Sequence, residues 1–169
     1  MNRIILISDV DGCLTDGGMY YDSTGKVMKR FSAGDHEGLK LLKKNNIEVI
    51  FITADKVGEP ITRQRINDMS NSELHVISEK ERPNFIKKYK DNYDYIIFFG
   101  DGLGDAQIKR KNICDIFVCP NQSIKPVKEC ADIITKNEGG HAAFLEMSIA
   151  VLNNLLRNKI IDNIQELYE

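Results

Sequence analysis

The chain alternates short apolar runs with longer amphipathic segments, and this alternation constrains its fold more than any other feature. Each run is four to six residues long and rich in β-branched and aromatic side chains. A strand buried on both faces reads as a continuous apolar run, and such strands separated by helices are typical of a parallel sheet covered on both sides. The sequence therefore predicts an α/β fold. The expected strands cover residues 4–8, 49–53, 74–77, 95–100, 116–119 and, more weakly, 131–134.

The segments between these runs have helix length, with one exception near the N-terminus. Residues 18–31 place the turn residues Asp22-Ser23-Thr24-Gly25 between two β-prone arms, which predicts a protruding β-hairpin. The last amphipathic segment carries an apolar stripe, typical of a helix packed against a core. Helices are expected near residues 36–45, 59–69, 82–90, 104–111, 123–129 and 140–156.

The length of 169 residues suits one compact domain, and 42% hydrophobic residues are enough to form its core without disulfides or metals. We expect residues 1–157 to form this domain and residues 158–169 to form a helical extension or a tail. The cysteines include no C-x-x-C pair, so reduced thiols are favoured over a zinc site or disulfides. These cysteines are Cys13, Cys114, Cys119 and Cys130.

Charge and hydropathy argue against two classes of partner. The 23 Lys and Arg residues nearly balance the 25 Asp and Glu residues, which leaves a formal charge of -2 and no basic excess for nucleic-acid binding. The longest apolar runs are far shorter than the roughly 20 residues that span a bilayer. The N-terminus also lacks the long apolar region of a signal peptide. We therefore expect a cytoplasmic protein that acts neither on nucleic acid nor at a membrane.

Acidic residues follow two of the predicted strands, where apolar sequence gives way to glycine. Asp9 and Asp11 follow the first strand, and Asp101 and Asp105 follow the fourth. Ligands of parallel α/β sheets bind at the carboxyl ends of strands, and neighbouring carboxylates repel unless a cation lies between them. Two such ends can build one oxygen-only site, which predicts Mg²⁺. Asp105, like Asp16, could instead be a turn or helix-capping residue.

Several other catalytic motifs are absent from the sequence. The acidic loops lack the ligand spacing of an EF-hand, and the glycines after the fourth strand miss the spacing of a dinucleotide fingerprint. There is no G-K-[ST] for a P-loop and no G-x-S-x-G for a serine nucleophile. No cysteine is followed by arginine six positions later. Aspartate is therefore the best candidate nucleophile.

The acidic motifs and two further positions resemble the four motifs of the haloacid dehalogenase superfamily. The match consists of D-x-D-G-x-L-T-D after the first strand, Thr53 ending the second, a basic residue opening a later helix, and G-D-x-x-x-D after the fourth strand. The resemblance runs from about Ile4 to Leu152. It implies a Rossmann-like fold with a central parallel sheet flanked by helices.

Two longer segments are similar to a capless group within this superfamily. GGMYYDSTGKVMKRFSAGDHEGLKLL and NEGGHAAFLEM resemble the small phosphatases acting on 3-deoxy-D-manno-octulosonate 8-phosphate and relatives acting on nine-carbon sialic-acid-type 9-phosphates. The spacing agrees, because no stretch between Asp16 and Lys80 has room for a large folded cap. The resemblance implies a phosphatase for a phosphorylated 2-keto-3-deoxy sugar acid of surface-polysaccharide biosynthesis. It also implies a homotetramer assembled through the 18–31 hairpins.

The resemblance implies a role for each acidic residue. Asp9 would take the phosphoryl group as an aspartyl phosphate, and Asp11 would protonate the leaving sugar oxygen and then activate water. Asp9, the backbone carbonyl of Asp11 and Asp101 would bind Mg²⁺. Asp105 would support the metal directly or through water. Thr53 would offer its hydroxyl to phosphate oxygens.

Three further residues complete the predicted site. A cation should neutralise the charge that develops on the phosphate, and residue identity favours Lys80 for this role while register favours Arg82. We prefer Lys80 and keep Arg82 as its equal for testing. Asp35 and His141 lie in the segments similar to the capless phosphatases, and both are candidates for substrate contact.

The sequence also departs from the family pattern. Thr53-Ala54-Asp55 stands where relatives usually carry Thr-Gly-Arg, which should weaken anion binding beside the phosphate. Gly34 stands where an Arg commonly precedes the Asp that matches Asp35, and Gly102 stands where a second acid is common. Two alternatives therefore stay open. One is a phosphatase for another small metabolite, and the other is a non-catalytic module that keeps the scaffold for oligomerisation, as domains appended to sialic-acid-activating enzymes suggest.

Overall fold

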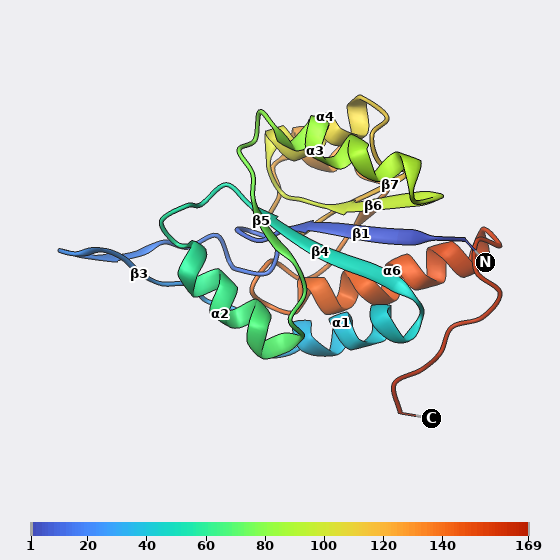
Figure 1. The fold of residues 1–169 in the computed structure, drawn as a ribbon, viewed down its shortest axis with the longest axis horizontal. Helices are drawn as coiled ribbons and strands as arrows, with labels where there is room; N and C mark the ends of the chain where they lie inside the picture. The colour runs from blue at the N-terminus through green and yellow to red at the C-terminus, as the bar shows by residue number, and fades with distance from the viewer. Residues whose placement is uncertain (1, 169) are drawn as a thin grey trace.

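The computed structural model describes residues 2–168 and shows an α/β fold built on one central sheet (Figure 1). The sheet has six strands in the order β5-β4-β1-β6-β7-β8, and every pairing is parallel. This confirms the predicted parallel sheet. The strands are β1 (Ile4–Asp9), β4 (Ile47–Thr53), β5 (Leu74–Val76), β6 (Tyr95–Phe99), β7 (Ile116–Cys119) and β8 (Ile133–Ile134).

The central position of strand β1 in the sheet explains why its sequence is continuously apolar. It is hydrogen-bonded to β4 on one side and to β6 on the other, and all six of its residues are buried. Because successive side chains point to opposite faces of a strand, Ile4 and Leu6 enter one hydrophobic cluster while Ile5 and Ile7 enter the other. The strand therefore belongs to the two cores above and below the sheet.

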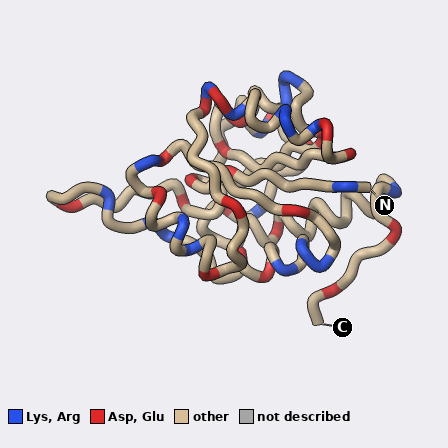
Figure 2. Tube along the Cα trace, in the orientation of Figure 1, with Lys and Arg blue, Asp and Glu red and all other residues tan. Residues whose placement is uncertain are grey.

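Helices cover both faces of the sheet (Figure 1). One layer contains α3, α4 and α5, and the other contains α1, α2 and α6, where α1 packs along α6. Basic and acidic positions are interspersed along the tube in both layers (Figure 2). The helices are α1 (Asp35–Lys44), α2 (Glu59–Met69), α3 (Arg82–Lys87), α4 (Leu103–Arg110), α5 (Lys125–Lys128) and α6 (Ala143–Arg157), and a 3-10 turn, η1 (Lys88–Asp91), follows α3.

The predicted hairpin is present and extends away from the sheet at the edge where the strands end (Figure 1). Its strands β2 (Tyr20–Asp22) and β3 (Gly25–Met28) are antiparallel. Asp22 accepts a hydrogen bond from the Thr24 amide at 2.7 Å, which is the Asx turn that its sequence predicts. The hairpin leaves large apolar side chains in solvent, namely Met19, Tyr20, Tyr21, Val27 and Met28.

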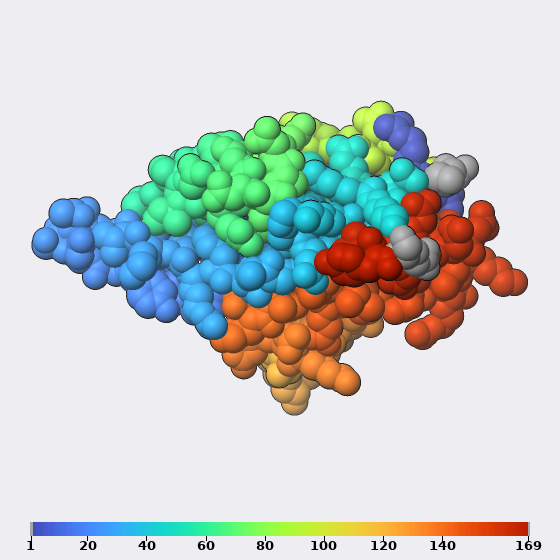
Figure 3. Space-filling model, turned by 90° about the horizontal axis from the view of Figure 1, so that it is seen from below, coloured from blue at the N-terminus to red at the C-terminus, as the bar shows by residue number. Residues whose placement is uncertain are grey.

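The last residues form a tail that folds back along the chain's own helices. Residues 158–168 contain no helix or strand. The tail lies against α1 and α6 (Figure 3), where Ile164 and Leu167 pack on the core and the Gln165 amide donates to the side chain of Asn45 at 2.8 Å. It therefore lies away from the edge that carries the hairpin (Figure 1).

Three further observations complete the fold. Across residues 2–168, no helix is both long and apolar enough to cross a membrane. All four cysteines have free thiols, and Cys13, Cys114 and Cys119 are buried. Helix α6 begins at Ala143 rather than near residue 140, because Gly140 and Ala142 have positive φ angles of 70° and 65°, which a right-handed helix does not contain. Gly139 is packed tightly against the loop after β1, where a Cβ atom would lie 2.1 Å from the carbonyl oxygen of Gly12.

Candidate active site

The carboxyl ends of three neighbouring strands bring the predicted site residues together. Asp9 and Thr53 are the last residues of β1 and β4, which lie side by side, and Asp101 follows β6 on the other side of β1. A cavity of about 520 Å³ opens above these strand ends. The base of the hairpin contributes Met19, Tyr21 and Lys26 to its lining.

Arg82 lies at the centre of this acidic group. It is the first residue of α3, and it is buried. Its guanidinium donates to both carboxylate oxygens of Asp9, at 3.1 and 3.0 Å, and to Asp105 at 2.5 Å. Burial alone would lower the pKa of Arg82, but Asp9 and Asp105 raise it above its ordinary value. The side chain therefore remains a cation fixed between two buried carboxylates.

Asp105 organises the loop that carries Asp101. Its Oδ2 atom accepts hydrogen bonds from the amides of Asp101 at 3.1 Å and Gly102 at 3.0 Å, and this closes the start of α4. The other oxygen faces Arg82. The capping role and the chemical role left open for Asp105 are thus both compatible with its position. Gly12 has φ +85° and a Cβ there would lie 2.1 Å from Asp101 Oδ2, so only glycine admits this approach of the two loops.

The site holds more negative charge than its cation balances. One carboxylate oxygen from each of Asp9, Asp101 and Asp105 lies within 4.8 Å of the others. Burial raises the pKa of Asp9 well above its ordinary value, and the nearby Asp105 raises it further. Burial and Asp105 also raise the pKa of Asp101 to about 7. Clustered hard oxygen donors with unbalanced charge fit a divalent cation such as Mg²⁺.

Asp11 lies beside this cluster and is held from two sides. Its Oδ2 atom accepts a hydrogen bond from the Thr53 hydroxyl at 2.9 Å, and its Oδ1 atom pairs with Lys29 Nζ at 2.7 Å. The side chain is about one-third exposed and lines the cavity. Thr53 is itself buried, and its hydroxyl also accepts the Asp55 amide at 3.0 Å. Asp11 can therefore reach a ligand in the cavity, while the buried Thr53 hydroxyl stays hydrogen-bonded to it.

Two hairpin lysines belong to the site although the sequence reasoning did not select them. Lys26 pairs with Asp55 at 2.5 Å and Lys29 pairs with the same carboxylate at 2.8 Å. Burial would raise the pKa of Asp55, but hydrogen bonds from both lysines hold it well below its ordinary value. Lys29 also pairs with Asp11, so the two lysines balance the charges of two acids. A sequence signal was available, because a partly buried acid such as Asp55 requires a nearby cation.

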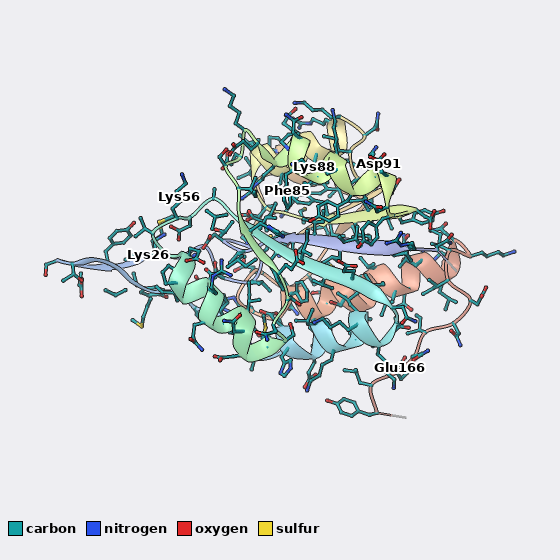
Figure 4. The ribbon with its side chains drawn as sticks, viewed as in Figure 1. Lys26, Lys56, Phe85, Lys88, Asp91 and Glu166 are labelled. Carbon is teal, nitrogen blue, oxygen red and sulfur yellow. The ribbon has the colours of Figure 1, made fainter. Side chains whose placement is uncertain are left out.

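The two candidate cations, Lys80 and Arg82, lie in different places. Arg82 opens α3 and points into the carboxylate cluster. Lys80 is exposed in the turn before α3 and lines a separate groove. Lys56, Phe85 and Lys88, which are labelled in Figure 4, line the same groove. The structure therefore brings Arg82 to the acids and leaves Lys80, which the sequence argument preferred, outside them.

Asp35 and His141 are also outside the cavity. Asp35 is the first residue of α1, its side chain is buried, and neither of its oxygens has a hydrogen-bond partner. In this conformation a substrate has no access to it. His141 is exposed beside the loop after β1, where its Nδ1 atom lies 3.0 Å from the Gly139 carbonyl and its ring contacts Arg30. Substrate contact by either residue stays a prediction.

Comparison with known proteins shows similarity along nearly the whole chain, although no family model matches it. The chain is 28% identical over 168 residues to the 3-deoxy-D-manno-octulosonate 8-phosphate phosphatase KdsC of Haemophilus influenzae, covering 97% of this chain and 91% of that protein. It is 29% identical to N-acylneuraminate cytidylyltransferase B of Danio rerio over 88% of this chain, but it spans only 36% of that enzyme.

A solved structure supports the same relationship. The cobalt-bound deoxy-D-mannose-octulosonate 8-phosphate phosphatase of Haemophilus influenzae superposes with a TM-score of 0.78 at 28% identity, covering 95% of this chain and 94% of that one. The similarity includes the sheet whose strand ends carry Asp9, Thr53 and Asp101. The chain is thus similar along nearly its whole length to KdsC-like phosphatases of the haloacid dehalogenase superfamily.

Proposed function

We propose that the chain is a magnesium-dependent phosphatase that hydrolyses a phosphorylated 2-keto-3-deoxy sugar acid through an aspartyl phosphate on Asp9. The observation that carries this proposal is the cluster of Asp9, Asp101 and Asp105 carboxylates at the carboxyl edge of the sheet, with Arg82 bound between Asp9 and Asp105. Its acids supply a nucleophile and oxygen ligands, and its arginine supplies a cation for phosphate oxygens.

In the first step, a carboxylate oxygen of Asp9 attacks phosphorus and the bond from phosphorus to the sugar oxygen breaks. Asp11 gives its proton to the leaving sugar oxygen, so the sugar departs as a neutral alcohol. Arg82 donates to both oxygens of Asp9 before substrate binds, so it must transfer donors to the phosphate for Asp9 to attack. This transfer moves its positive charge toward the oxygens where negative charge develops.

In the second step, water attacks phosphorus and the bond between phosphorus and the Asp9 oxygen breaks. Asp11, now ionised, takes the proton of that water, which restores both carboxyl groups to their starting states. Thr53 holds Asp11 from below in both steps, because its hydroxyl donates to Asp11 Oδ2. Inorganic phosphate is the second product.

The residues that would hold Mg²⁺ are Asp9, Asp101 and the backbone carbonyl of Asp11, with Asp105 fixing the loop of Asp101. The bound cation would shield the negative nucleophile from the negative phosphate. The three clustered carboxylate oxygens fit this role better than a structural one, because Arg82 alone does not balance their charge. The related enzyme described above binds cobalt, also a divalent cation.

The relatives and the shape of the site support the proposed substrate class. Two relatives that match nearly the whole chain are phosphatases of 3-deoxy-D-manno-octulosonate 8-phosphate. The cavity of about 520 Å³ has both acidic and basic walls, which suits a polar sugar acid. Lys26 and Lys29 both pair with Asp55, so this acid does not leave an unbalanced negative charge beside the cavity. A nine-carbon sialic-acid-type 9-phosphate is the alternative of the same class.

The experiment is a panel of phosphate esters assayed for phosphate release with Mg²⁺. The panel contains the eight-carbon and nine-carbon keto sugar acids, hexose phosphates and nucleotides. We expect the highest kcat/KM with one of the two keto acids. Preference for a hexose phosphate or a nucleotide would contradict the substrate class and leave the mechanism standing.

The hairpin supports a homotetramer in which neighbouring subunits complete the open site. Its exposed apolar side chains form the kind of patch that marks a protein contact, with Met19, Tyr21 and Met28 between 59% and 65% exposed. Met19 and Tyr21 also line the cavity, so a contact there would change the wall of the site. Light scattering should give four times the chain mass, and Tyr21→Asp should lower both mass and activity. A fully active monomer would contradict this assembly.

The alternative is a non-catalytic oligomerisation module. One observation favours it, because the chain matches about a third of an N-acylneuraminate cytidylyltransferase over most of its own length. The cluster of three carboxylates around a single buried arginine argues for catalysis, since a fold that did not use this excess negative charge would gain no stability from it. A phosphate release rate no higher than background with every ester would favour the module.

A further inference from the structure

Lys29 carries an almost fully buried ammonium group in the site, and nothing in the proposed mechanism so far uses it. Only 2% of its side chain is exposed. Its Nζ atom lies 2.7 Å from Asp11 Oδ1, 2.8 Å from Asp55 Oδ2 and 3.0 Å from Thr62 Oγ1. A lysine ammonium has three donors, and each has one acceptor here. The position of this cation is therefore fixed.

These three acceptors come from separate parts of the fold. Asp11 belongs to the loop after β1, Asp55 to the loop after β4, and Thr62 to α2. Lys29 itself follows the second hairpin strand, so its ammonium joins the hairpin to all three. The base of the hairpin lies close to α2, where Lys26 is labelled in Figure 4. A buried ammonium at this junction orients whatever carboxylate it binds.

The carboxylate of Asp11 is oriented from both ends. Lys29 binds its Oδ1 atom and the Thr53 hydroxyl binds its Oδ2 atom, so rotation about the side chain would break one contact or the other. About one-third of the Asp11 side chain remains exposed toward the cavity. This arrangement restrains the carboxyl group without covering it, which is what a positioned proton donor requires.

We propose that Lys29 is a positioning residue that holds Asp11 in the orientation for proton transfer to the leaving oxygen. The inference rests on the proposed function and deepens it, because it assigns the hairpin a role inside its own subunit's site. Lys29 does not contact the reacting atoms. It acts through Asp11, and the hairpin thereby becomes part of the catalytic apparatus as well as an assembly surface.

Leaving-group dependence separates this role from simple phosphate binding. A sugar alcohol leaves poorly without a proton, whereas p-nitrophenolate leaves readily without one. Loss of proton donation therefore lowers kcat/KM for a sugar phosphate far more than for p-nitrophenyl phosphate. Loss of a cation that only attracts phosphate lowers both by the same factor, because the two esters carry the same phosphate group.

The experiment compares Lys29→Met with wild type on 3-deoxy-D-manno-octulosonate 8-phosphate and p-nitrophenyl phosphate. We expect the loss of kcat/KM to be at least about tenfold larger with the sugar phosphate, within the range that general acid catalysis supplies. Lys26→Met is the matched control, because Lys26 pairs with Asp55 from the same hairpin and, within residues 2–168, forms no ion pair with Asp11. Its losses on the two esters should be equal.

Two further measurements keep the test decisive if Lys29→Met folds poorly. Thr62→Val keeps the shape of its side chain but removes one acceptor of Lys29, and it should give a smaller loss with the same leaving-group dependence. A crystal structure of either variant should show the Asp11 carboxylate turned away from Thr53. Equal losses on both esters in an active enzyme would overturn the role of Lys29 alone. A wild-type protein that hydrolyses neither ester would overturn the proposed function as well.

Discussion

Arg82 and Asp9 form a two-point ion pair in the buried centre of the site, with both oxygens of Asp9 accepting from one guanidinium. Such a pair is costly to bury and costly to break, because removal of one partner leaves the other charged and unpaired. Asp105 shares the same guanidinium at 2.5 Å. We therefore expect Arg82 to contribute to both stability and phosphate release, and mutation can separate the two contributions.

Substitution of Arg82 should cost both stability and activity. Arg82→Met leaves Asp9 and Asp105 without their cation, and we expect a loss of about 3 to 5 kcal/mol in the free energy of unfolding. Arg82→Lys keeps the charge but loses the forked geometry, so its loss should be smaller. Urea unfolding measures these values, and phosphate release should fall with Arg82→Lys even where the protein stays folded.

Lys80→Met is the control for Arg82. Lys80 is exposed and outside the cavity, so its replacement should change stability by less than about 0.5 kcal/mol and leave phosphate release within a factor of about two. Loss of activity in Lys80→Met with full activity in Arg82→Lys would reverse the assignment of the cation.

Divalent cation binding should stabilise the fold through Asp101. Burial and Asp105 raise the pKa of Asp101, which means that its ionised form is disfavoured without a counter-charge. Mg²⁺ binds only the folded site, so it should raise the Tm of the wild type as its concentration increases. Asp101→Asn should reduce this shift, whereas Asp16→Asn, an acid whose Oδ1 accepts the Gly18 amide at 2.8 Å, should keep it. An equal shift in all three proteins would count against this site.

Asp35 should make the stability of the protein fall as pH rises. Burial raises the pKa of Asp35 to about 7 from an ordinary value of 3.8, while the Ser32 amide and Arg65 lower it less. Between these values the folded state binds more protons than the unfolded state, so the free energy of unfolding decreases with pH and levels off above about 7. Asp35→Asn should therefore be more stable than wild type above pH 7, by about 1 to 3 kcal/mol.

Urea unfolding across this pH range tests the role of Asp35. The difference between Asp35→Asn and wild type should shrink as pH falls from about 7 and become small below the ordinary pKa of 3.8, where the aspartate is protonated in both states. Glu37 lies on the same turn but is exposed, so Glu37→Gln should differ only slightly from wild type in its free energy of unfolding. A gain from Asp35→Asn that stays constant from acid to neutral pH would contradict a raised pKa.

The sheet and the acidic residues at its strand ends could be predicted from the sequence, because both depend on local sequence pattern. Continuous apolar runs marked the buried strands, and Asp9 and Asp101 lay at their ends, where a parallel sheet brings residues together. The hairpin followed from turn chemistry around Asp22. These features need no knowledge of how distant segments pack.

The remaining features depend on distant contacts, and sequence reasoning did not reach them. Whether Lys80 or Arg82 enters the site depends on where α3 starts, and helix ends are uncertain by one or two residues. Lys29 meets Asp11 only because the hairpin folds back toward α2. Ala142 adopts φ +65° just before α6, a conformation that no local preference of alanine predicts.

The most direct test of the account is phosphate release from 3-deoxy-D-manno-octulosonate 8-phosphate with Mg²⁺, compared between wild type and Asp9→Asn. The asparagine keeps the size of the side chain but removes the nucleophilic carboxylate. We expect a clear wild-type rate and a loss of at least about 10³-fold in the variant, with the fold retained by circular dichroism. Equal rates in the two proteins, or rates at background in both, would contradict Asp9 as the nucleophile of a phosphatase.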